Sequence, residues 1–211
     1  MSRFRLQRRP LVDTSGLPAE LPPLLRRLYA SRGVCAGHEL ERSAKALLHP
    51  KQLLHNERAA TLLADALEQQ RRLVVIGDFD ADGATSTALC VLALRAMGAH
   101  QLQFLVPNRF DYGYGLSPEI VADAVALNAE LIITVDSGIS CHAGVAAAKA
   151  AGLQVLITDH HLPGAQLPPA DVIVNPNQPA CPFPSKVMAG VGVAFYVMSA
   201  LRAELRQRGY F

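Results

Sequence analysis

The stretch LVVIGDFDADG, residues 73–83, decides the fold of this chain. Its first half is a short apolar run rich in β-branched residues, which is typical of a strand buried on both faces. Its second half contains three acids, Asp78, Asp80 and Asp82. Because alternate residues of an extended segment share a face, the three carboxylates can point the same way. The stretch therefore predicts a strand that ends in a cluster of acids.

Two further apolar runs end in polar residues. Residues 131–135 (LIITV) lead into Asp136, and residues 154–158 (QVLIT) lead into the run Asp159-His160-His161. Helix-like segments separate the three runs, so the strands should be parallel. Parallel strands end at one edge of a sheet, where open α/β folds place their ligands. The acids and imidazoles that follow the three runs are therefore expected to converge.

The pattern of the whole chain predicts an α/β fold. We expect a parallel sheet of about five strands with helices on both faces, preceded by a helical amino-terminal segment. The expected strands cover residues 73–77, 102–106, 131–135, 154–158 and 171–174. Residues 1–70 are expected to form a basic tail and a helical lead-in that packs on the core, with helices over residues 23–31, 39–48 and 56–70. Residues 71–211 are expected to form the α/β domain.

The composition describes a packed globular protein. Half of the 211 residues are hydrophobic, 18% are charged, and the net charge is +2, which does not predict a strongly basic nucleic-acid-binding surface. The four cysteines have no CxxC spacing and are expected to be reduced thiols, which favours the cytoplasm. The longest nearly apolar run, residues 187–201, is shorter than a membrane span requires. No association with a membrane is expected.

The converging side chains predict a metal site. Several carboxylates in one cleft are unstable without cations. Mixed carboxylate and imidazole donors suit Mn²⁺ or Mg²⁺, and a pair of ions can support phosphoryl displacement. Each element also has a simpler explanation: the acids of residues 78–82 can form a surface turn, and Asp136 can be a helix N-cap. No Walker A loop or GxGxxG motif follows the first strand, so a nucleoside triphosphate or dinucleotide is not expected.

Three motifs resemble those of the DHH phosphoesterase superfamily: DFDADG at residues 78–83, TVDSGI at 134–139 and TDHH at 158–161. Further stretches are similar to the RecJ branch of that superfamily, which comprises bacterial single-strand DNA exonucleases. They are PNR at residues 107–109, GYGLS at 113–117 and AGVGVAF at 189–195. The resemblance extends over roughly residues 45–211, with the motifs in the expected order.

The resemblance implies roles for single residues. Asp80 and Asp82 match metal ligands, and Asp78 can compensate for a family histidine that is Ile76 here. Asp136 matches the carboxylate that bridges both metals, and Asp159 matches a residue that orients its neighbours. The implied metal ligands are Asp78, Asp80, Asp82, Asp136 and His160. The implied catalytic residues are Asp136, His160, which binds the second metal, and His161, which faces the scissile phosphate.

The same resemblance implies hydrolysis of single-stranded DNA from its 5′ end in DNA repair and recombination, with two Mn²⁺ or Mg²⁺ ions. A single-strand-binding protein or a repair helicase is a further expected partner. The alternatives are a phosphoesterase for short oligonucleotides or cyclic dinucleotides, and a binding scaffold without catalysis.

Arg109 is expected to contact a phosphate, and Tyr114 or Tyr112 to line the cleft, although the tyrosines can instead pack the loop. The family continues beyond residue 211, so the chain is expected to be an incomplete catalytic domain that can be inactive alone.

Overall fold

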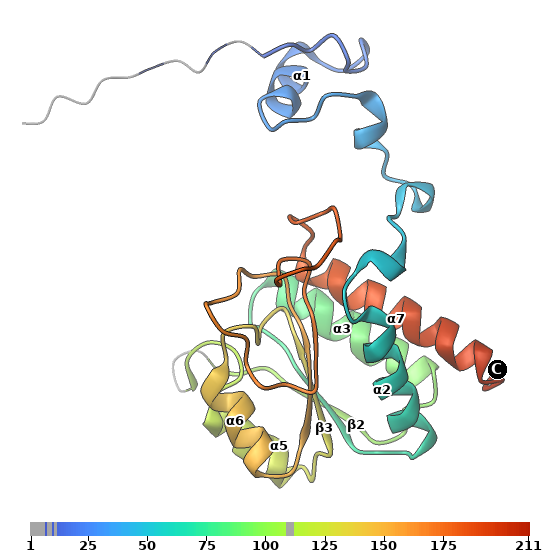
Figure 1. Cartoon of the computed structure of the whole chain (residues 1–211), viewed down its shortest axis with the longest axis vertical. Helices are drawn as coiled ribbons and strands as arrows, with labels where there is room; N and C mark the ends of the chain where they lie inside the picture. Colours follow the sequence, from blue (N-terminus) through green and yellow to red (C-terminus); the bar gives the residue numbers. More distant parts are fainter. Residues whose placement is uncertain (1–6, 8–9, 11, 109–111) are drawn as a thin grey trace, which may run out of the picture. The chain divides into compact units, whose positions relative to one another are not determined.

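The computed structural model describes residues 7, 10, 12–108 and 112–211 (Figure 1). By its internal contacts the chain divides into two compact units, Met1–Leu47 and Leu48–Phe211. The second unit contains the whole sheet. The domain boundary expected at residues 70 and 71 remains a prediction, whereas the boundary between compact units lies between Leu47 and Leu48.

The second unit is built on a five-stranded sheet in the order β2-β1-β3-β4-β5, and every neighbouring pair is parallel. The strands are β1 (Leu73–Ile76), β2 (Leu102–Leu105), β3 (Leu131–Val135), β4 (Gln154–Thr158) and β5 (Val172–Val174). From β1 the chain adds β2 on one side and then returns to add β3 on the other. The carboxyl ends of β1 and β3 therefore form a topological switch point, where open α/β sheets bind their ligands.

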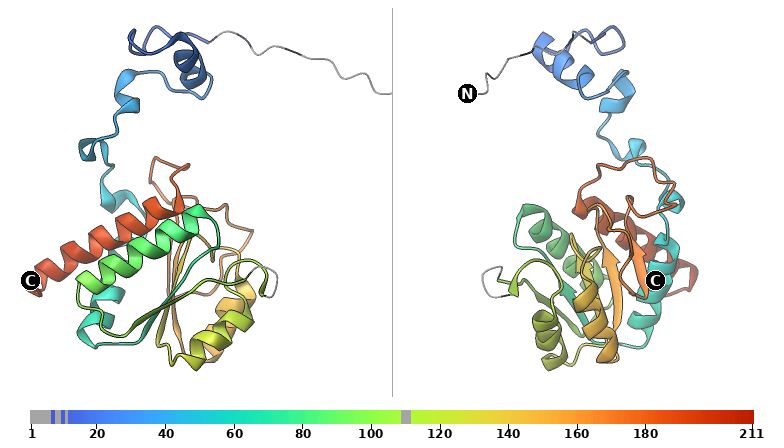
Figure 2. Two further views of the ribbon diagram at one scale, coloured as in Figure 1. Left: turned by 180° about the vertical axis from the view of Figure 1, so that it is seen from behind. Right: turned by 60° about the vertical axis from the view of Figure 1, so that its left-hand side comes forward.

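Helices cover both faces of the sheet, as the sequence predicted (Figure 2). The helices of this unit include α2 (Asn56–Glu68), α3 (Ala81–Ala96), α5 (Pro118–Ala126), α6 (His142–Ala150) and α7 (Gly190–Gln207). Side chains from α2, α3 and α7 pack on one face, with Val75 and Ile133 of the sheet. Side chains from α5 and α6 pack on the other face, with Val74 and Ile132.

Burial on both faces explains why the central strands are continuous apolar runs. All residues of β1 and β3 are buried, whereas Gln103 and Phe104 of the edge strand β2 are exposed. A polar side chain caps the start of two helices, α3 and α5. Ser117 accepts a hydrogen bond from the Ile120 amide and starts α5, with Pro118 at its first position.

The amino-terminal part is less helical than expected. Helix α1 (Pro23–Ala30) forms as predicted, but the helix expected over residues 39–48 is absent. The described chain instead has three 3₁₀ turns, η1 (Gly37–Leu40), η2 (Ala44–Ala46) and η3 (Pro50–Gln52). Glu41 has an extended backbone, with ψ of 129°, and its carboxylate accepts a hydrogen bond from the Ser43 amide. None of the residues in these turns is buried, so no packing stabilises a longer helix.

Helix α2 belongs with the sheet. Ala59, Leu63 and Leu67 on one side of it are buried in the core shared with α7. It begins at Asn56, and the N-cap is His55, whose φ of 63° is left-handed. Asn56 is therefore the first helical residue and not the cap. No helix in the described part of the chain is both long and apolar enough to cross a lipid bilayer.

Candidate metal centre

The predicted acids and histidines meet at the carboxyl edge of the sheet. Asp78 follows β1, Asp136 follows β3, and the pair His160 and His161 follows β4. Within the described residues, two groups have donor atoms that all lie within 4.8 Å of one another. One group is Asp78, Asp80 and Asp136, and the other is Asp136, His160 and His161. Asp136 belongs to both groups, so it lies at the centre of the site.

Asp136 has an unusual backbone and a buried carboxylate. Its backbone is left-handed, with φ of 58°, and its side chain is buried. Its Oδ1 receives no hydrogen bond from any described residue. His160 Nε2 lies 3.0 Å from Oδ1, in a contact without hydrogen-bond geometry. Burial, followed by the charges of Asp82 and Asp80, raises the pKa of Asp136 to about 7.

Helix α7 begins against this carboxylate. A Cβ on Gly190 would lie 2.5 Å from Asp136 Oδ1 and 2.9 Å from its Cβ and Cγ, so any larger residue here would force the Asp136 side chain to move. In the sequence, this glycine was singled out only as part of the AGVGVAF stretch at residues 189–195. A glycine at the first position of a helix is the signal that could have drawn attention to it.

Asp82 binds the same end of α7. Its Oδ2 accepts a hydrogen bond from the Gly190 amide at 2.7 Å, and its Oδ1 accepts one from the Val191 amide at 2.8 Å. A carboxylate in this place satisfies two unpaired amides and interacts favourably with the helix dipole. Its Oδ2 also lies 3.6 Å from His160 Nε2. Asp82 lies at the site but in neither three-residue group of the described chain, and its role as a metal ligand remains a prediction.

Asp159 holds the histidine pair. Its buried Oδ1 accepts hydrogen bonds from the His160 amide at 2.7 Å, the His161 amide at 3.1 Å and His161 Nδ1 at 2.8 Å, and its Oδ2 accepts one from the Ile139 amide at 2.9 Å. Burial raises the pKa of Asp159 most strongly, but the hydrogen bonds from His161 and Ile139 together outweigh it and lower the pKa. The bond to Asp159 raises the pKa of His161. His161 Nδ1 is thus engaged, and Nε2 faces the site.

Tyr114 lies beside His161. Its hydroxyl is 3.4 Å from His161 Nε2, and the two rings meet edge to face with centroids 6.1 Å apart. Burial and the charge of Asp78 raise the pKa of the hydroxyl. Tyr114 and His161 also line a cleft of about 680 Å³ with residues from the starts of α5 and α6. Arg109 lies outside the described residues, so its expected phosphate contact is not described.

Two asparagines contact the site without having been predicted. Asn175 Nδ2 donates to the His161 carbonyl at 2.9 Å, and Asn177 Nδ2 donates to the His160 carbonyl at 2.6 Å. The sequence indicated Asn175-Pro176 only as the end of the last strand. The repeated asparagine around Pro176 was the available signal, but its partners lie in the preceding loop, 14 and 17 residues earlier in the chain.

The donor set fits divalent cations that prefer oxygen and imidazole ligands. Carboxylate oxygens suit Mg²⁺ and Mn²⁺, and imidazole is compatible with Mn²⁺. The buried, unpaired oxygen of Asp136 supports this fit, because such an atom is unfavourable unless a donor or a cation satisfies it. Asp78, Asp80 and Asp136 could hold one ion, and Asp136 and His160, with His161 beside them, a second one.

Comparison with known proteins agrees with this geometry. The DHH family, N-terminal domain, matches residues 72–209. The single-stranded-DNA-specific exonuclease RecJ of Escherichia coli K12 is 58% identical over 209 residues, which are 99% of this chain and 36% of that protein. RecJ of Thermus thermophilus is 38% identical over 186 residues, which are 88% of this chain and 27% of that protein. The chain thus spans about a third of the length of these relatives.

Solved structures give the same result. A crystal structure of exonuclease RecJ bound to manganese superposes with a TM-score of 0.69 at 38% identity, covering 75% of this chain and 40% of that one. RecJ from Thermus thermophilus in complex with Mn²⁺ superposes with a TM-score of 0.67 at 35% identity, covering 84% of this chain and 24% of that one. Because the family match extends over most of the chain and includes every acid and histidine of the site, this chain belongs to the DHH family.

Proposed function

We propose that this chain is the DHH part of a metal-dependent exonuclease that hydrolyses single-stranded DNA from its 5′ end. One observation carries the proposal: two groups of metal-compatible donors share Asp136 at the switch point of the sheet. The 58% identity to a single-stranded-DNA-specific exonuclease supports the choice of substrate. Repair and recombination of DNA are the setting that follows from this activity.

Two ions, Mn²⁺ or Mg²⁺, are the proposed cofactors. Asp78, Asp80 and Asp136 would hold one, and Asp136 and His160 would hold the other, with Asp82 and His161 close by. Such a pair, when bound, activates a water and stabilises the leaving oxygen of a phosphodiester. The structures of RecJ with Mn²⁺ support this choice of metal.

The protein's own residues orient the reacting groups. His161 is held through Nδ1 by Asp159, so its Nε2 is the atom available to a phosphate oxygen. Asp136, fixed by its backbone and by contact with Gly190, keeps one direction for its carboxylate. Asp136, His160 and His161 are therefore the proposed catalytic residues.

The substrate would enter along the cleft beside Tyr114. The half-exposed ring can stack on an unpaired base, and Arg109 is proposed to contact a phosphate of the strand. Beyond the DNA, a single-strand-binding protein or a repair helicase is the proposed partner, and the cytoplasm is the proposed location. Co-purification with either protein from cell extract tests the partners.

Digestion of labelled DNA tests the function. The protein is incubated with Mn²⁺ and 5′-labelled DNA, single- or double-stranded, and we expect labelled mononucleotide from the single strand alone. EDTA and Asp136→Asn should each abolish it. Asp123→Asn, the same change on the outer helix α5, is the matched control and should leave activity unchanged. Release of label from the duplex at an equal rate, or activity of Asp136→Asn, would contradict the proposal, as would cleavage restricted to short oligonucleotides or cyclic dinucleotides.

A further inference from the structure

The two histidines of the site are held by their main chain as well as by Asp159. Their amides donate to Asp159 Oδ1 at 2.7 Å and 3.1 Å. Their carbonyls accept from Asn177 at 2.6 Å and from Asn175 at 2.9 Å. Both polar main-chain groups of each histidine therefore have a side-chain partner. A turn bound in this way has little freedom to shift the rings that it carries.

The two asparagines form one preorganised unit. Asn175 is buried, and its Oδ1 accepts a hydrogen bond from the Asn177 amide at 2.7 Å. This bond fixes the Asn175 side chain relative to the main chain of Asn177. Pro176 between them restricts the backbone further. The side-chain Nδ2 groups of the two asparagines are thereby spaced to reach the successive carbonyls of His161 and His160.

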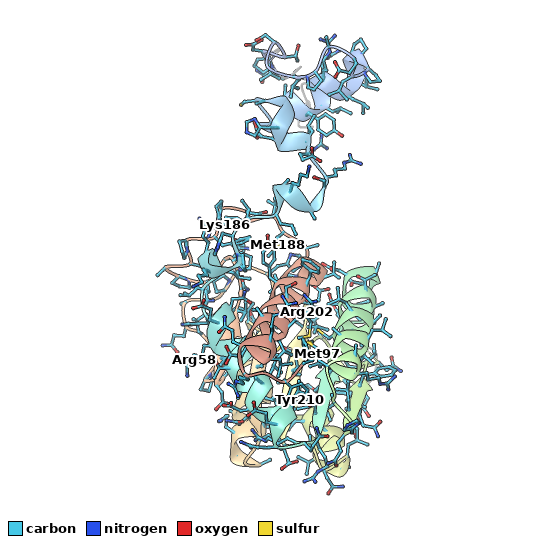
Figure 3. All side chains as sticks on the ribbon, turned by 90° about the vertical axis from the view of Figure 1, so that its right-hand side faces the viewer. Arg58, Met97, Lys186, Met188, Arg202 and Tyr210 are labelled. Carbon is cyan, nitrogen blue, oxygen red and sulfur yellow. The ribbon has the colours of Figure 1, made fainter. Side chains whose placement is uncertain are left out.

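The same segment continues to the other side of the site. Asn177 Nδ2 also donates to the Lys186 carbonyl at 3.1 Å, and Lys186 Nζ donates to the carbonyls of Pro176 and Cys181 at 2.6 Å and 2.8 Å. These bonds connect Lys186 with residues 176, 177 and 181, so the two ends of this loop lie close together. Figure 3 shows Lys186 and Met188 at the end of the fold where α7 begins.

A few residues later the segment reaches Asp82, through the amides of Gly190 and Val191. Residues 175–191 therefore connect the turn after β4 with the turn after β1. These two strands are not neighbours, because β3 lies between them. No sheet hydrogen bond can set the distance between the two turns directly, whereas this segment binds both.

We infer that Asn177, supported by Asn175, is a positioning residue that holds the His160 and His161 turn in register with the acids of the site. It acts through the main chain of the histidines and contacts no reacting atom. The consequence for catalysis rests on the proposed function, because it requires that the histidines and acids bind metal together. Metal ligands must be held within a few tenths of an ångström, so loss of a supporting hydrogen bond weakens binding.

Hydrogen exchange in EDTA tests the inference without metal. In Asn177→Ala, we expect the peptide that contains His160 and His161 to exchange about tenfold faster, because a turn with a lost partner opens locally. The β3 peptide should be unchanged. Gln166→Ala removes an exposed amide side chain from the loop after the histidines and serves as the control. Unchanged exchange of the histidine peptide would overturn the inference, and so would equal acceleration in β3, which indicates general destabilisation.

Metal binding and kinetics form the second arm. Asn177→Ala should raise the Kd for Mn²⁺, measured by electron paramagnetic resonance, by about tenfold, in the range seen for residues that support metal ligands. It should lower kcat on single-stranded DNA and leave KM within about twofold, since Asn177 does not contact substrate. A Kd equal to that of the control would overturn the catalytic consequence.

Asn177 is partly exposed, whereas Asn175 is fully buried, so substitution of Asn177 disturbs the packing less. If Asn177→Ala does not fold, Asn177→Ser serves in both arms, because its hydroxyl is too short to reach the His160 carbonyl. If the unmodified protein neither binds Mn²⁺ nor digests DNA, the proposed function fails. The exchange arm still decides whether Asn177 holds the turn, so the two failures are distinguishable.

Discussion

Asp136 and Asp159 hold equivalent positions in the fold and have opposite environments. Each is the first residue after a buried strand, β3 or β4, and each is 1% exposed. Asp159 accepts four hydrogen bonds, and its pKa is lowered. Asp136 Oδ1 receives none from the described residues, and the pKa of Asp136 is raised to about 7. Burial alone therefore does not set the direction of the pKa shift of an acid at a strand end. The number of hydrogen-bond donors around the carboxylate sets it.

The difference separates a structural acid from an acid that is available to a ligand. Asp159 is satisfied within the protein and stabilises the turn that carries the histidines. Asp136 faces Asp80, Asp82 and the first residue of α7, none of which provides a donor to its Oδ1. His160 Nε2 lies 3.0 Å from that oxygen but without hydrogen-bond geometry. Without a cation it is a source of instability. Four experiments test this difference between the two acids, in order of decreasing expected effect.

Asp136→Asn should have the largest effect on activity. We expect more than about a 100-fold loss of Mn²⁺-dependent nuclease activity, since even residues that only support metal ligands account for about 10- to 100-fold. In EDTA the same variant should be at least as stable as the unmodified protein, because it removes a buried charge near other acids. Activity assays and thermal unfolding measure the two quantities. A large loss of stability in EDTA would show that Asp136 is a structural acid like Asp159.

Asp159→Asn should reverse the pattern and destabilise the protein in the absence of metal. The NH₂ group of asparagine would face N–H groups that now donate to the carboxylate. This mismatch should lower the free energy of unfolding by about 2–4 kcal/mol. For a domain of this size we expect the melting temperature to fall by roughly 5–10 °C. Calorimetry in EDTA measures it, with Asp123→Asn on α5 as the control. An unchanged melting temperature would remove the distinction between the two acids.

The pH dependence of stability should differ between the two acids. With a folded pKa near 7 and an ordinary unfolded pKa, Asp136 makes the metal-free protein less stable as pH rises from about 4 to 7, by up to about 1.4 kcal/mol per unit. Asp159, with a lowered pKa, contributes stability that is lost only as pH falls below about 4. Urea unfolding at pH 5 and 7 in EDTA measures the first effect. Asp136→Asn should abolish it, and a slope that persists in this variant would assign it to other groups.

Gly190→Ala should have the smallest effect on stability and a clear effect on the site. Gly190 is the first residue of α7, so alanine changes helix propensity little there, but its Cβ would displace the Asp136 carboxylate. Mn²⁺ affinity should therefore fall although the fold persists, as calorimetric titration can measure. Gly192→Ala, two residues further along the same helix, is the matched control. Its Cβ meets only the flexible side chain of Met188, so metal affinity should be retained. Equal affinities of the two variants would contradict the role of Gly190.

The sequence predicted the sheet and the convergence of the site because both depend on local patterns. Buried parallel strands are continuous apolar runs, and their ends share an edge, so the meeting of Asp78, Asp136 and His160 follows from the topology. The partners of each acid depend on distant segments. Asp82 binds amides 108 and 109 residues later, and no local pattern predicts that contact.

The error in the amino-terminal part has a similar cause. Helical propensity favoured residues 39–48, but a helix of that length needs a packed face, and no residue of the turns there is buried. The asparagines after β5 were missed because their function lies in side-chain bonds to another loop. The hydrogen-bond partners of the site residues therefore depend on contacts across the sheet edge, which the spacing of residues along the chain does not predict.

The left-handed backbone of Asp136 narrows what can replace it. Among residues other than glycine, asparagine and aspartate adopt such a φ most readily, because their short polar side chains can form local hydrogen bonds there. Asparagine would keep this conformation and lose the negative charge, whereas glutamate would keep the charge and strain the main chain. Aspartate is therefore specified twice at this position, once by its conformation and once by its chemistry, and no second amino acid meets both demands.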